Sequence, residues 1–133
     1  MMKRRLEALA RIGKLRKQLH ELAGWRLAQI GCRRDGLVAD ERAIWQAMGE
    51  GLCAYGPPAE AGMRRIRRLE AEIAAAEAAY AAQSRHAFRE GARAKLAERA
   101  HEGLEAKYRD QQQRKELAEL IERSLGKPPS SSA

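Results

Sequence analysis

The sequence predicts an all-α fold, a long antiparallel two-helix coiled-coil hairpin, on three observations. Alanine, leucine, arginine, glutamate and lysine, which are strong helix formers, dominate the 133 residues. β-branched residues are scarce, since Val38 is the only valine and there is no threonine, which argues against a sheet. The four prolines fall in two pairs, Pro57-Pro58 and Pro128-Pro129, and proline breaks a helix interior. We therefore predict a helix, one sharp break, a second helix and a short tail.

The first helix is predicted over residues 3–54, because its apolar residues recur every three or four positions. This stripe comprises Leu9, Ile12, Leu15, Leu19 and Leu22, and later Leu37, Ile44, Met48, Leu52 and Tyr55. The turn is predicted at residues 55–58. There Gly56 suits the left-handed residue that ends a helix, and Pro58 suits the first turn of the next helix.

The second helix is predicted over residues 58–125, followed by a flexible tail at 126–133 that is rich in proline and serine. Its apolar stripe includes Ile66, Leu69, Ile73, Ala76 and Tyr80, and it ends in Leu117, Leu120, Ile121 and Leu125. At this length we expect a single helical-hairpin domain, residues 1–125.

The two stripes suggest a register for the hairpin. Facing residues of an antiparallel pair have position numbers with a nearly constant sum. Ile44 with Ile73, Met48 with Leu69, and Leu37 with Tyr80 all give about 117. In this register roughly the last ten residues of the second helix extend beyond the first as an unpaired apolar stripe. Because two helices bury only one seam, we expect the chain to work against a partner or as an oligomer.

The positive charge is concentrated at the start of the chain. The net charge is +8, and residues 1–34 hold ten Lys/Arg against two Asp/Glu, so this quarter carries the whole excess. Such a zone predicts an acidic partner: nucleic acid, anionic lipid or an acidic protein surface. Cys32 and Cys53 lie about 30 Å apart on one predicted helix, so we expect two free thiols, which fits a reducing cytoplasm.

Residues that carry chemistry are not grouped in this sequence. The glycines form no phosphate-binding loop, and His20, His86 and His101 are isolated from one another. A nucleophilic cysteine would need a histidine and a pocket, which two helices hardly provide. We therefore expect no enzyme activity, no cofactor, no metal and no small-molecule substrate.

Three surfaces are candidates for binding. The first is the basic face of the first helix, which includes Arg4, Arg5, Arg11 and Lys14. The second is the tip, with Trp45, Met48, Leu52, Tyr55 and Met63, where aromatic residues could anchor a partner. The third is the overhang, with Leu117, Leu120 and Ile121. The plainer interpretations are a solvated helix face for the first and local packing for the second.

The layout resembles a known family. A basic first helix, a break before mid-chain and a longer second helix resemble the stalk proteins of type III secretion and flagellar export (the FliJ, YscO and InvI group). The segment from Arg34 to Gln46 is similar to the InvI-like stretch that approaches the tip. The resemblance implies a non-enzymatic cytoplasmic protein, peripheral to an inner-membrane secretion apparatus. Its partners would be a hexameric secretion ATPase, an export-gate protein and export chaperones.

Mapped on this sequence, the resemblance places Arg4, Arg5, Arg11 and Lys14, with the overhang, at the ATPase. It places Trp45, Met48 and Tyr55, with Leu69 and Ile73, at the tip that meets the export gate. Two alternatives remain. The basic helix could bind nucleic acid or an anionic membrane, although it carries few aromatic residues for stacking and no recognisable nucleic-acid motif. The hairpins could instead associate weakly as a homodimeric scaffold.

Overall fold

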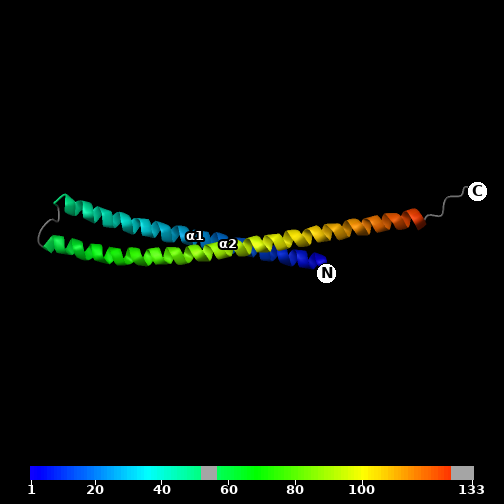
Figure 1. Cartoon of the computed structure of the whole chain (residues 1–133), viewed down its shortest axis with the longest axis horizontal. Helices are drawn as coiled ribbons and strands as arrows, with labels where there is room; N and C mark the ends of the chain where they lie inside the picture. Colours follow the sequence, from blue (N-terminus) through cyan, green and yellow to red (C-terminus); the bar gives the residue numbers. More distant parts are fainter. Residues whose placement is uncertain (52–56, 127–133) are drawn as a thin grey trace, which may run out of the picture. The chain divides into compact units, whose positions relative to one another are not determined.

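The computed structural model describes residues 1–51 and 57–126, and over these residues the chain forms two α-helices and no strand. Helix α1 spans Met2–Gly49 and helix α2 spans Pro57–Gly126, with 48 and 70 residues. The two helices run in opposite directions (Figure 1). The expectation of an all-α helical hairpin is therefore confirmed.

The helix ends differ from the expected ones near the turn. Helix α1 ends at Gly49 rather than at residue 54. Gly51 has a φ of 81°, and its N–H donates to the carbonyl of Met48 at 3.2 Å. Because only glycine adopts this left-handed conformation without strain, Gly51 ends the helix. The residue expected there, Gly56, lies with residues 52–55 outside the described residues.

Helix α2 begins at Pro57, so the proline pair occupies its first turn, where the missing N–H groups are not needed. The helix ends at Gly126, one position from the expected boundary, and the tail 127–133 lies outside the described residues. The sequence predicts one domain over 1–125. In the structure the chain divides into two compact units. Unit 1 comprises residues 1–17 and 93–133, and unit 2 comprises residues 18–92.

The core of unit 2 is a seam between a segment of α1 and a segment of α2. Ile66, Leu69, Ala76 and Ala87 of α2 and Ala23 of α1 are buried, and Ile66 is only 1% exposed. In unit 2, buried or half-buried positions of α2 recur at alternate spacings of three and four residues, at 59, 62, 66, 69, 73, 76, 80, 83, 87 and 90; the half-buried positions 63, 86 and 91 lie beside this series. This spacing is typical of a coiled-coil seam.

The register in unit 2 differs from the expected one. A Cβ placed on Gly31 would lie 3.3 Å from Cε2 of Tyr80, and one on Gly62 would lie 3.3 Å from Sδ of Met48. The position numbers of these facing residues sum to about 110 instead of about 117, so the register of the hairpin is shifted by one heptad. Tyr80 therefore faces Gly31 instead of Leu37, and Met48 faces Gly62 instead of Leu69. The expected pairing was wrong because a shift of seven residues preserves the same stripe.

Unit 1 has a thinner seam, with Leu6 and Leu9 of α1 half-buried, as are residues 94, 97, 101, 104 and 108 of α2. The expected stripe on the first half of α1 mostly faces solvent. Ile12 and Leu15 are exposed in unit 1, and Leu19 and Leu22 are exposed in unit 2. Helix α1 carries two series at three- and four-residue spacing in this region. The one that packs against α2 contains smaller and polar residues, so hydrophobicity alone selected the wrong series.

Candidate protein-docking site

The described residues contain no group of three or more His, Cys, Asp or Glu side chains that could hold a metal ion. The thiol of Cys32 is exposed. The features that could bind a partner are therefore surfaces, and three of them lie in unit 1.

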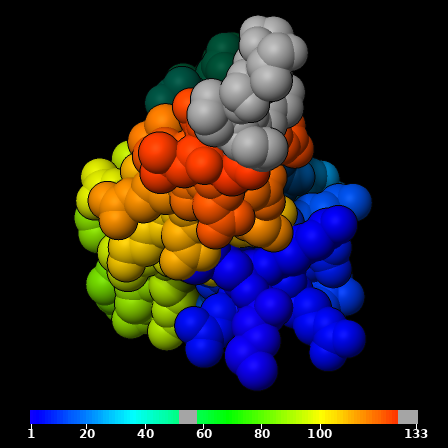
Figure 2. All heavy atoms as spheres, turned by 90° about the vertical axis from the view of Figure 1, so that its right-hand side faces the viewer, coloured from blue at the N-terminus to red at the C-terminus, as the bar shows by residue number. Residues whose placement is uncertain are grey.

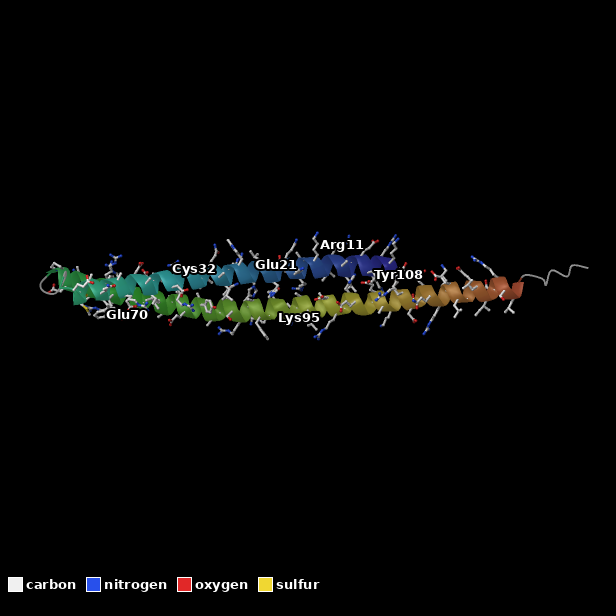
Figure 3. All side chains as sticks on the ribbon, turned by 90° about the horizontal axis from the view of Figure 1, so that it is seen from above. Arg11, Glu21, Cys32, Glu70, Lys95 and Tyr108 are labelled. Atoms are coloured by element: carbon white, nitrogen blue, oxygen red, sulfur yellow. The ribbon has the colours of Figure 1, made fainter. Side chains whose placement is uncertain are left out.

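The first surface is the basic face of α1. Arg4, Arg5, Arg11 and Lys14 are all exposed, and the first turn of α1 contains no acidic residue. Arg11 lies on the side of α1 that faces away from α2 (Figure 3). Arg4 and Arg5 lie in the first turn of α1, where the helix dipole opposes cations, so these two charges do not stabilise the helix. The charge is available to an acidic partner.

The second surface is the overhang, which we define as Arg109–Gly126 of α2. Every residue of this segment is exposed. Tyr108 lies beside the first turns of α1, and α2 continues past them (Figure 3). Leu117 and Ile121 are 58% and 49% exposed, and Leu120 and Leu125 are also exposed. The sequence predicts this unpaired apolar stripe, and the overhang is longer than the expected ten residues because of the register shift.

The overhang is not built to pair with a longer α1. If the seam of α2 continued beyond Tyr108 at the same spacing, it would use Gln111, Lys115, Ala118, Glu122 and Leu125. Three of these five side chains are polar or charged, whereas Leu117, Leu120 and Ile121 lie off this series. The apolar stripe of the overhang therefore faces a direction that α1 does not cover, and it suits a different partner.

The third surface is an open groove between the two helices of unit 1, with a volume of about 530 Å³. Its floor is apolar and small, and its charged lining is entirely basic. The lining consists of Arg5, Ala8, Leu9, Arg99, Ala100, Gly103, Leu104 and Lys107. The N-terminal turns of α1 (blue) and the overhang (orange to red) share the face of the molecule in Figure 2. We call the open groove between the two helices of unit 1 the basic groove.

Sequence reasoning identified Arg5 but missed Arg99 and Lys107. These two residues lie in the part of the chain whose charges balance, so net charge did not single them out. A signal was present in their spacing. Arg99, Gly103 and Lys107 recur every four residues, which puts two cations on one side of α2 around a position without a side chain.

The expected tip surface is not assembled as such. Leu69 is buried and Ile73 is half-buried between the helices of unit 2, so neither is free to contact a partner. Met48 packs against Gly62. Trp45 is exposed, and its indole N–H donates to Oε1 of Glu41 at 3.4 Å. Tyr55 lies outside the described residues, so Trp45 is the member of this set that a partner could reach.

Comparison with protein-family models, with curated proteins and with solved structures returned no match. Among the described residues, neither helix combines the length and the apolar character needed to cross a membrane.

Proposed function

We propose that this chain is a non-enzymatic stalk and regulatory component of a type III secretion or flagellar export ATPase complex. One observation supports the proposal above others. Unit 1 ends in an overhang of α2 whose apolar stripe packs against none of the described residues, beside a basic face on α1. A helix of this kind fits the pore of a ring-shaped ATPase, where apolar and acidic surfaces can enclose it.

The energetics favour a docking role for the overhang. Each large aliphatic side chain that moves from water to a buried site contributes about 1.5–3 kcal/mol. Leu117, Leu120 and Ile121 are all exposed, so this contribution is unused in the free chain. Arg4, Arg5, Arg11 and Lys14 add steering towards an acidic ring. We propose that Trp45 contacts the export-gate protein.

In this role the chain would work at the cytoplasmic side of an inner-membrane secretion apparatus, and export chaperones would be additional partners. It requires no catalysis by the chain itself. The chain would act by changing the turnover of the ATPase, because an element inside a ring favours some subunit arrangements over others.

The test is the turnover and sedimentation of the purified secretion ATPase with and without the full chain. We expect binding and a change in turnover. Arg11→Glu with Lys14→Glu, and separately Leu117→Ser with Ile121→Ser, should weaken both by tenfold or more, about 1.4 kcal/mol. Arg67→Glu with Arg68→Glu is the matched control, because these exposed arginines lie in unit 2. An ATPase that neither binds the chain nor changes its turnover would end the proposal.

The basic groove favours a second candidate, the binding of a phosphate-bearing surface, either nucleic acid or anionic lipid. Arg5, Arg99 and Lys107 line it without an acidic residue among its lining. Such binding falls steeply with salt, since each neutralised phosphate releases counterions. Duplex DNA and acidic vesicles, titrated against the chain at two salt concentrations, would reveal it. Absence of binding to both would leave the ATPase proposal alone.

A further inference from the structure

Exposed apolar side chains continue the basic groove of unit 1 along both helices. On α1, Ile12 is exposed and lies one turn beyond Ala8, a lining residue. On α2, Leu96 is exposed and lies one turn before Ala100, another lining residue. Leu96, Ala100 and Gly103 are separated by four and three residues, so they share one face of α2. The apolar surface that a partner can cover is therefore longer than the groove itself.

The charges that border this surface have one sign. Arg5, Arg99 and Lys107 are the charged residues of the lining, and all three are exposed. The glutamates of the same stretch of α2, at positions 98, 102 and 105, do not belong to the lining. Helical geometry puts the first and the last of them on the side of α2 opposite Gly103. An apolar floor with cations at its edges suits a partner that is both apolar and acidic.

The shape of the groove favours an α-helix as its occupant. Gly103 has no side chain, and a Cβ placed on it would find no atom within 4 Å, so another helix can approach closely here. Arg99 and Lys107 lie four residues to either side of Gly103, which puts them about 12 Å apart along α2. A helix that lies along α2 reaches both cations with carboxylates two turns apart. A bilayer or a DNA duplex would meet the cations and leave the apolar floor uncovered.

We propose that the basic groove binds an acidic amphipathic α-helix of a partner protein, which makes unit 1 a three-helix bundle. Docking of an amphipathic helix by its apolar face into a groove is a recurrent mode of recognition. Carboxylates at positions i and i+8 of the partner helix pair with Arg99 and Lys107. An apolar side chain at position i+4 lies over Gly103, and its neighbours cover Ile12 and Leu96.

The overhang of a second copy is not this helix. Residues 109–126 hold four Lys/Arg and four Asp/Glu, so the overhang has no net charge that would attract it to the groove. Binding of the acidic helix goes beyond the proposed stalk role and does not depend on it, because it concerns the isolated chain and a peptide. Phosphate-bearing surfaces would compete for the same three cations, so the test includes them.

The probe is an alanine-based helical peptide of ~20 residues with Glu, Leu and Glu at positions i, i+4 and i+8, titrated by fluorescence anisotropy at ~0.15 M salt. We expect the full chain to bind it with a dissociation constant on the order of 0.1 mM, and to bind a peptide with lysine in place of glutamate at least tenfold more weakly. Arg99→Glu with Lys107→Glu should invert this preference. Arg67→Glu with Arg68→Glu, in unit 2, is the matched control and should leave it unchanged.

Gly103→Leu separates docking in the groove from attraction between charges. It fills open space and changes no charge, so the helices should persist by circular dichroism while peptide binding weakens at least tenfold. Equal binding of the glutamate and lysine peptides, or no binding of either at ~1 mM, would overturn the proposal. So would unchanged peptide binding by Gly103→Leu, or duplex DNA or acidic vesicles that displace the peptide and bind Gly103→Leu as well as the unaltered chain.

Discussion

Tyr80 of α2 lies so close to Gly31 of α1 that a Cβ at this position would be tighter than an ordinary van der Waals contact. A Cβ on Gly31 would lie 3.3 Å from Cε2 of the Tyr80 ring. Gly31 lies in the interior of helix α1 and is buried. Because a heptad stripe permits several registers, a contact between the largest and smallest residues of the seam selects one of them.

Replacement of glycine by alanine should separate seam positions from open positions. Gly24→Ala removes a flexible residue from α1 where no atom lies within 4 Å, so it should stabilise the fold by about 0.5–1 kcal/mol. Gly31→Ala gains the same helix propensity, but its methyl group presses on Tyr80. We expect it to be neutral or destabilising by about 1 kcal/mol. Urea unfolding measures both. Equal stabilisation by the two variants would show that the ring is not packed on Gly31.

Arg34 should stabilise the same contact through its charge. Its guanidinium lies 4.5 Å from the centroid of the Tyr80 ring, and it also pairs with Asp35 at 3.3 Å. Tyr80→Phe retains the aromatic face, so stability should change little, whereas Arg34→Ala should cost about 0.5–1 kcal/mol. In the background of Tyr80→Leu the cost of Arg34→Ala should largely vanish. A cost that is unchanged in that background would place the effect elsewhere.

Gln83 provides a polar contact across the seam of unit 2. Its Nε2 donates to the backbone carbonyl of Ala23 at 3.1 Å, and both residues are shielded from solvent. Gln83→Met keeps the length of the side chain and removes the donor, so we expect a loss of about 0.5–1.5 kcal/mol. Gln112→Met, in the exposed overhang, is the matched control and should have no effect on unfolding. A gain in stability from Gln83→Met would mean that the hydrogen bond contributes nothing net.

Replacement of isoleucine by alanine should affect folding at one position and docking at another. Ile66 is 1% exposed, so Ile66→Ala should cost about 2–5 kcal/mol in the free energy of unfolding. Ile121 is 49% exposed, so Ile121→Ala should change it by less than about 0.5 kcal/mol. Only the second variant should weaken binding of the overhang while the fold is intact. A large loss of stability from Ile121→Ala would show that the overhang is packed within the chain.

The hairpin could be predicted from the sequence, because helix formers are abundant and the proline pair at 57–58 permits only one early break. The register could not be predicted from periodicity alone. Pairing Leu37 with Tyr80 matches one apolar residue to another and satisfies the stripe as well as the observed pairing does. That pairing would also place the midpoint of the turn beyond Pro58, although α2 already begins at Pro57. The bulk of Tyr80 against Gly31 settles the question, and such matching is visible in sequence only when glycines are considered.

The candidate site, like the fold, could be predicted from the sequence only in part. The basic face and the overhang could be recognised because an excess of charge and an unmatched length of helix are properties of the sequence. Arg99 and Lys107 were missed because the basic groove depends on how two distant segments meet in unit 1. Leu69 was assigned to the tip because it lies near the turn in sequence, yet it is buried in the seam.

The central claim is that α2 beyond Tyr108 is an unpaired helix reserved for a partner. Amide hydrogen exchange of the dilute full chain tests it most directly. We predict that the amides of residues 109–126 exchange much faster than those of residues 62–108, and that they become protected when a partner binds. Equal protection of both segments in the dilute free chain would contradict the account.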